Sequence, residues 1–158
     1  MQQVSKRPTR GSRKTRVGRV SIPDQVYHIT TCTAERRSVF REFANARCVI
    51  AALRRQHDEG FASTLAFVVM PDHLHWLMQL GAAKALPLVV AAVKSESARY
   101  IRQASGDRYT VWQRGYFDRA MRRDEDLVAV ARYIVANPLR AGLVASISEY
   151  PHWDACWM

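Results

Sequence analysis

The sequence predicts an α+β fold, in which an antiparallel sheet has helices packed on one face. Three observations indicate this class. Segments rich in β-branched and aromatic residues alternate with segments whose apolar residues recur at helical spacing. Two predicted strands, 64–70 and 73–80, are separated only by the turn signal Pro71-Asp72, which is typical of a hairpin. The length of 158 residues and the 48% apolar content suit one domain with a core.

The first half of the domain is predicted to contain three strands and two helices, in the order strand, helix, strand, strand, helix. Residues 26–33 are β-branched and aromatic and therefore predict a strand. Residues 41–56 repeat apolar side chains at helical spacing, and Gly60 ends the helix that they predict. The hairpin 64–80 follows. Residues 86–105 carry a second apolar stripe and predict a second helix.

The second half is predicted from its turn and capping signals. Residues 109–112 predict a short strand. The acidic run from Asp124 to Asp126 predicts the start of a third helix, because acids stabilise the first turn. That helix is predicted to end near Asn137, since a following proline biases a residue away from helical geometry. Gly142 is predicted to end a short helical turn after it.

Positive charge is concentrated at the start of the chain. The net charge is +10, of which residues 1–19 supply +7 and residues 20–158 only +3. We expect 1–19 to form a basic, flexible tail in front of a single domain, 20–158. Nucleic-acid phosphate is its expected partner, although a tail that only aids solubility is the alternative. The basic side chains that we expect to contact DNA there include Arg13, Lys14 and Arg16.

The composition argues against several other classes of protein. No stretch approaches the roughly 20 apolar residues of a membrane span, and the basic start lacks the apolar segment of a secretory signal. The three cysteines are odd in number and widely spaced, which favours reduced thiols. We therefore expect a cytoplasmic protein associated with the nucleoid, with no membrane partner.

Two histidines separated by one apolar residue form the first candidate site. In a strand, residues i and i+2 point to the same face, so His73 and His75 can hold one divalent ion between them. For the pair by itself, two ordinary strand histidines are the alternative interpretation.

The third predicted helix supplies a possible second half of this site. Tyr133 and Asn137 are four residues apart and therefore share a helical face. Two imidazoles and the Asn137 carboxamide oxygen would hold Mg²⁺ or Mn²⁺, and the Tyr133 phenol beside the ion would attack a phosphorus. Considered separately, each of the two is more often a structural residue. Tyr100 is the rival nucleophile, but Ala104 stands where a ligand would be needed.

Four motifs together resemble a known family. Residues 71–77 resemble the His-hydrophobic-His motif of single-tyrosine HUH transposases. Three further segments resemble those of the REP-associated tyrosine transposase branch. Residues 111–118 resemble the segment that precedes the tyrosine helix, residues 133–144 resemble the tyrosine-helix signature, and residues 150–154 resemble the motif that closes the domain.

The resemblance implies a fold, a chemistry and a set of roles. It implies the ferredoxin-like HUH endonuclease fold, a Mg²⁺ or Mn²⁺ ion, and cleavage of single-stranded DNA through a 5′-phosphotyrosine intermediate. It carries over Tyr133 as nucleophile and His73 and His75 as metal ligands. The resemblance also implies Asn137 as the third ligand, although that position is commonly Gln in related transposases.

The implied substrate is a repetitive extragenic palindrome, a DNA hairpin with a short single-stranded guide beside its foot. Basic side chains suit its phosphates, although solvated surface charge is the alternative for each of Lys94, Arg99, Arg102, Arg114, Arg119, Arg122 and Arg123. Trp76, Trp112 and Tyr116 are candidates for stacking on unpaired bases, with a core position as the alternative. Asp72 either orients a histidine or only forms the turn.

These observations favour a metal-dependent, single-stranded DNA endonuclease and strand transferase, working as a monomer or homodimer. A catalytically inactive DNA- or RNA-binding protein of the same fold is the alternative. A zinc hydrolase is a third class, and it would need a further ligand such as His28.

Overall fold

The computed structural model describes residues 20–158. The predicted basic tail and its candidate DNA contacts Arg13, Lys14 and Arg16 lie outside the described residues.

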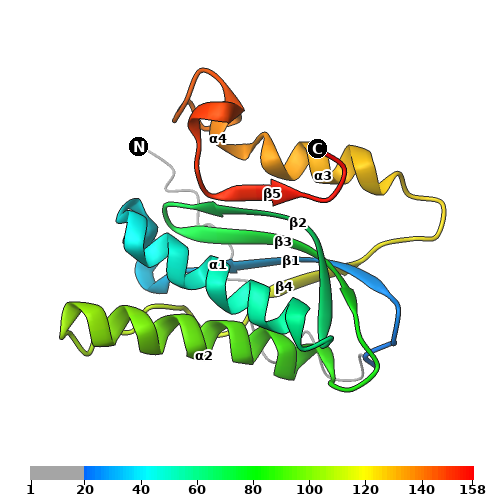
Figure 1. Ribbon diagram of the computed structural model, residues 1–158, viewed down its shortest axis with the longest axis horizontal. Helices are drawn as coiled ribbons and strands as arrows, with labels where there is room; N and C mark the ends of the chain where they lie inside the picture. The colour runs from blue at the N-terminus through cyan, green and yellow to red at the C-terminus, as the bar shows by residue number, and fades with distance from the viewer. Residues whose placement is uncertain (1–19) are drawn as a thin grey trace, which may run out of the picture.

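The described chain forms one five-stranded antiparallel sheet with the strand order β4-β1-β3-β2-β5 (Figure 1). The elements follow the order β1 (Val26–Cys32), α1 (Phe43–Asp58), β2 (Ala62–Met70), β3 (His73–Leu80), α2 (Leu86–Ser105) and β4 (Phe117–Ala120). This βαββαβ order and strand arrangement are those of a ferredoxin-like fold. The predicted α+β class and antiparallel sheet are therefore confirmed.

The C-terminal part adds two helices and one edge strand. These are α3 (Leu127–Val135), α4 (Asn137–Arg140) and β5 (Trp153–Ala155), which pairs with β2. Three short 3₁₀ helices complete the chain: η2 (Ala34–Arg36), η3 (Val39–Arg41) and η4 (Ile147–Glu149).

Local signals explain where the main helices begin and end. The α2 helix has the predicted bounds, and Gly106 follows it in the left-handed conformation with φ 75°. The third helix starts at the predicted acidic run, because the Asp126 side chain accepts a hydrogen bond from the Ala129 amide at 3.0 Å. Pro138 then separates α3 from the single turn of α4.

The two faces of the sheet have separate apolar cores. The helices α1 and α2 pack against each other and against the face that carries Leu74, Trp76 and Met78. Ala131 and Ile134 of α3 instead belong to the core on the opposite face. Figure 1 shows α1 and α2 together on one side of the molecule and α3 and α4 on the other.

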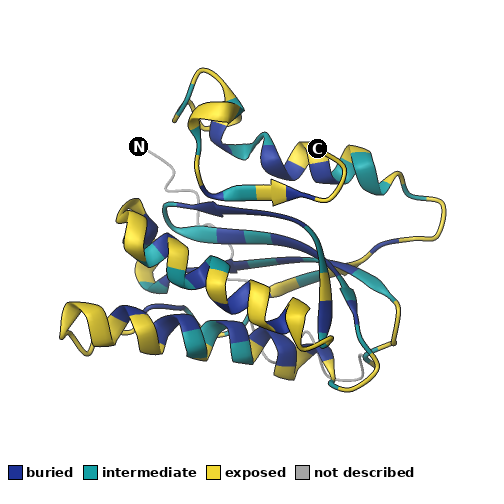
Figure 2. Ribbon diagram, viewed as in Figure 1, coloured by how far each residue is buried: buried dark blue, intermediate teal, exposed yellow. Residues whose placement is uncertain are grey.

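The expectation that the helices all pack on one face is therefore corrected for α3. The reason lies in β2, where every residue from Ala66 to Met70 is buried. Side chains alternate between the two faces of a strand, so a strand buried at consecutive positions needs apolar cover on both faces. The continuous buried stretch is visible in Figure 2, and α3 supplies the second cover.

One further expectation differs from the structure. Residues 109–112 form only an isolated bridge between Thr33 and Trp112, and the edge strand is β4, five residues further on. The chain bulges between Thr64 and Ala66, so the regular pairing of β2 with β3 starts anew after the bulge. In the part of the chain from residue 20 onward, no helix is long and apolar enough to span a bilayer.

Candidate active site

The two histidines of β3 lie side by side on the face that α3 partly covers. Their ring centroids are 4.9 Å apart, and the rings meet edge to face at 87°. Leu74 lies between them in sequence and packs into the opposite core. The predicted placement of both rings on one strand face is confirmed.

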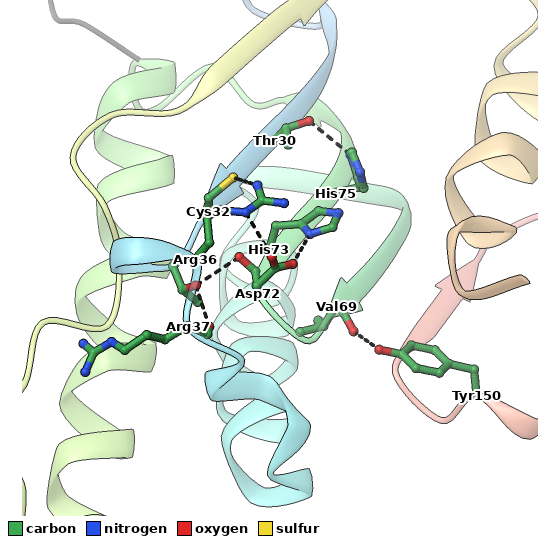
Figure 3. Close-up of polar contacts among 10 residues, drawn as sticks. Thr30, Cys32, Arg36, Arg37, Val69, Asp72, His73, His75 and Tyr150 are labelled. Carbon is green, nitrogen blue, oxygen red and sulfur yellow. Dashed lines mark hydrogen bonds and ion pairs between the residues drawn. The ribbon is translucent and has the colours of Figure 1, made fainter. Parts of the chain in front are cut away.

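His73 is held through one nitrogen by the hairpin turn. Its Nδ1 atom lies 2.6 Å from Oδ1 of Asp72, and Arg36 donates from Nε to the other carboxylate oxygen at 2.9 Å (Figure 3). A carboxylate accepts hydrogen bonds, so Nδ1 carries the proton in the neutral ring and Nε2 carries the free electron pair. Asp72 therefore orients this histidine in addition to forming the turn.

His75 is held in a similar way by β1. Its Nδ1 atom lies 3.1 Å from Thr30 Oγ1 and 3.1 Å from His28 Nε2. Burial, followed by the positive charges of His73, His28, Arg140 and Arg36, lowers the pKa of His75 to about 3. The ring is therefore neutral at neutral pH, which is the form that binds metals.

Tyr133 and Asn137 stand where α3 passes into α4. The Tyr133 side chain is 63% exposed, and Arg140 both stacks on its ring, with Cζ 3.8 Å from the centroid, and donates to its carbonyl at 2.7 Å. Asn137 donates from Nδ2 to the Ile134 carbonyl at 3.0 Å. That bond fixes the carboxamide and leaves Oδ1 as the atom that can accept or coordinate.

The end of α3 lies over the histidine face. Ile134 packs in one core with Leu77 and with Val68, the strand partner of His75. The charge of Arg140 is also close enough to His75 to lower its pKa. The structure thus brings the tyrosine end of α3 and the histidine strand to the same side of the sheet.

These donors suit a small divalent cation. Each imidazole has its Nδ1 atom engaged and its Nε2 atom available, and the Asn137 carboxamide offers an oxygen. Within residues 20–158, no group of three or more His, Cys, Asp and Glu side chains is placed to hold a metal. His28 points its Nε2 atom at His75 instead, so the zinc-hydrolase interpretation lacks its third ligand.

The basic side chains predicted to contact DNA do not form one surface. Lys94, Arg99 and Arg102 lie on α2, which packs on the opposite face of the sheet. Lys94 donates to the carbonyls of Gln113 and Gly115 at 2.7 and 2.8 Å, and Arg102 donates to the Tyr109 carbonyl at 3.0 Å. Arg99 is exposed beside the Tyr100 ring.

The remaining basic residues lie on β4 or in the connections before and after it. Arg119 is on β4 opposite His28, and its charge contributes to the lowered pKa of that histidine after burial. It also forms an ion pair with Glu125 at 3.0 Å. Arg114, Arg122 and Arg123 are exposed on either side of β4.

The three aromatic candidates for base stacking are buried, so their alternative interpretation as core residues is the correct one. Trp76 is 1% exposed and donates to Thr64 Oγ1, while Trp112 donates to Ser97 Oγ. Tyr116 is also in the core. Phe117 is instead 49% exposed and pairs with Thr30, which itself pairs with His75. The pairing of β4 with β1 places Phe117 on the histidine face, and residue types and spacing do not reveal that pairing.

Comparisons with known proteins agree with this architecture. Residues 21–137 match the model of the family described as "Transposase IS200 like". A protein of Haemophilus influenzae assigned as a REP-associated tyrosine transposase is 30% identical over 99 residues, which are 56% of this chain and 56% of the relative. The chain thus spans about half the length of this curated relative.

Two solved structures share the fold. One is a REP-associated tyrosine transposase bound to a REP hairpin, with a TM-score of 0.70, 22% identity, and coverage of 85% of this chain and 79% of that one. The other, a protein of Deinococcus radiodurans assigned as a transposase, has a TM-score of 0.54 and 24% identity, and the match covers 74% of this chain and 93% of that one.

Proposed function

Because the chain belongs to the family of IS200-like transposases, we propose that it nicks and rejoins single-stranded DNA beside a hairpin through a 5′-phosphotyrosine intermediate. The observation that carries this proposal is the pair of adjacent histidines, each held through Nδ1 with Nε2 available, on the face to which α3 brings an exposed tyrosine. A solved structure with the same fold is bound to a REP hairpin, which supports a hairpin-associated substrate.

A Mg²⁺ or Mn²⁺ ion, when bound, would polarise the scissile phosphate and offset its charge. Nε2 of His73, Nε2 of His75 and Oδ1 of Asn137 are the atoms that would hold it. The low pKa of His75 keeps this ring in its ligating form across the physiological pH range. The hydrogen bond that His73 Nδ1 donates to Asp72, and the hydrogen bond between His75 Nδ1 and Thr30, hold the two rings in orientation.

Tyr133 is the nucleophile in this proposal. Its phenol oxygen forms a bond to the phosphorus, and the bond from phosphorus to the 3′ oxygen breaks. The phenol proton passes to solvent, and the departing 3′ oxygen takes a proton from solvent. The product is a 5′-phosphotyrosine with a free 3′-hydroxyl on the other fragment. Arg140, stacked on the ring, attracts the phosphodiester to the phenol. Attack by a second 3′-hydroxyl on the phosphotyrosine reverses the step and joins a new strand.

The single strand is proposed to approach across the β4 edge of the histidine face. Phe117 can stack on a base there, and Arg119 on the same strand can contact phosphate. Arg114, Arg122 and Arg123 extend this basic edge. Lys94, Arg99 and Arg102 lie on α2, which packs on the opposite face of the sheet, so we leave them out of this path. Association with the nucleoid and the monomer or homodimer state stay predictions.

A covalent trapping experiment tests the proposal. Purified protein is incubated with end-labelled single-stranded hairpin DNA that carries varied flanking sequences, in Mn²⁺ or Mg²⁺, and adducts are separated in denaturing gels. We expect an adduct with the natural chain that is lost in Tyr133→Phe and retained in Tyr100→Phe, the matched control on α2. Binding without adduct for every flank would instead support the inactive DNA-binding protein, and an adduct in Tyr133→Phe would exclude Tyr133 as nucleophile.

A further inference from the structure

The connection after β1 has an unusual backbone directly beside the histidine pair. Glu35 and Arg36 both have φ of 56°, although neither is glycine. The left-handed region is unfavourable for residues with a Cβ atom, and two successive residues there need support from their surroundings. Such backbone conformations are most often retained at functional sites.

Hydrogen bonds to the β2–β3 hairpin supply that support. Thr33 donates from its amide and from Oγ1 to the Asp72 carbonyl, at 2.9 and 3.1 Å. The same hydroxyl lies 2.7 Å from the Arg37 carbonyl, and the Arg36 amide donates to the Thr33 carbonyl at 3.1 Å. The turn is therefore fastened to the residue that precedes His73.

This backbone conformation directs the Arg36 side chain toward Asp72 and Cys32. Its Nε atom donates to Asp72 Oδ2 at 2.9 Å, and its Nη1 atom donates to Cys32 Sγ at 2.7 Å. Figure 3 shows the guanidinium reaching both groups, with the Asp72 carboxylate between Arg36 and His73. Two anchors fix the plane of the guanidinium, which a single point of contact would not do.

We propose that Arg36 is a positioning residue for the histidine site: through Asp72 it fixes His73 in the tautomer that carries its proton on Nδ1 and presents Nε2. The carboxylate is held by its Oδ2 atom, so Oδ1 stays 2.6 Å from the His73 ring. A neutral imidazole without such a fixed acceptor exchanges between two tautomers, and only one of them offers Nε2 to a ligand. The role in metal binding rests on the proposed function, whereas the tautomer assignment does not.

Glycine substitution separates this role from simple turn stability. Glycine adopts positive φ without steric cost, so Arg36→Gly should relieve the backbone while it removes the guanidinium. Glu35→Gly is the matched control, because the φ is the same and the hydrogen bonds of Asp72 do not involve Glu35. Both variants should therefore fold with melting temperatures equal to or above that of the natural chain.

Two measurements without DNA test the proposal. The first is the ¹⁵N chemical shifts of the His73 ring, which we expect to show the Nδ1–H tautomer in the natural chain and in Glu35→Gly, and a tautomer mixture in Arg36→Gly. The second is Mn²⁺ affinity by electron paramagnetic resonance, which we expect to fall about tenfold in Arg36→Gly only.

An unchanged His73 tautomer in folded Arg36→Gly would overturn the proposal. If the natural chain binds no Mn²⁺, or binds it as well after His73→Ala, the proposed metal site fails, while the ring shifts still decide the role of Arg36. A fall in affinity shared equally by Glu35→Gly would assign the effect to the turn and would also overturn the proposal.

Discussion

Mild acid should destabilise this protein through His75. The pKa of His75 is lowered from 6.5 to about 3, first by burial and then by neighbouring positive charges. Between these values the unfolded chain binds a proton that the folded protein does not, so the free energy of unfolding falls as the pH is lowered. From pH 7 to pH 5 the unfolded state gains about 2 kcal/mol from this one group, while the folded ring stays neutral.

Urea unfolding at pH 7, 6 and 5, with a chelator present, measures this loss in the natural chain and in His75→Gln. Glutamine keeps hydrogen-bonding capacity toward Thr30 and His28 but does not titrate. The lowered pKa of His28 contributes to the pH dependence of both proteins, so the difference between them isolates His75. We expect the natural chain to lose about 2 kcal/mol more than His75→Gln by pH 5. Equal losses in the two proteins would refute the assignment of a buried, neutral imidazole.

Four further outcomes are expected. Phe117→Ala should weaken binding of single-stranded DNA by about 1–3 kcal/mol in fluorescence anisotropy. Tyr100→Ala, on α2 at the opposite face of the sheet, should leave this binding unchanged. Ile134→Ala should lower the free energy of unfolding by about 2–5 kcal/mol in urea, because its side chain is fully buried between α3 and β2. Asn137→Leu should abolish Mn²⁺ binding, and Asn137→Gln, which keeps the carboxamide oxygen, should retain part of it. Deletion of residues 1–19 should reduce the salt dependence of DNA affinity, and an unchanged slope would exclude contact with phosphates.

The sequence predicted best those features that depend on local periodicity. The hairpin around Pro71-Asp72, the bounds of α2 and the shared face of His73 and His75 all follow from alternation or from helical spacing. The same alternation places Trp76 on the opposite face from the histidines, which favours its alternative interpretation as a core residue.

The features that were missed depend on contacts between distant segments. The short β4 strand is defined by its pairing with β1, and its four residues have no apolar alternation that would reveal it. The contact of Arg36 with Asp72 joins residues 36 positions apart and requires a left-handed backbone at a non-glycine residue. Neither condition can be recognised from residue types or spacing.

The position of the proposed nucleophile follows from the packing of the core. A helix stripe predicts that α3 is amphipathic, but it does not say which face of the sheet it covers. The burial pattern of β2 determines the face, because its consecutive buried residues need apolar contacts on the face opposite the one that α1 and α2 cover. Because His75 and Val68 are strand partners, the helix that covers Val68 also ends beside the histidines. The apolar side of α3 thus places Tyr133 on the same side of the sheet as the histidines. Substitutions that loosen Ile134 should therefore reduce adduct formation even where the histidines and the tyrosine are unchanged.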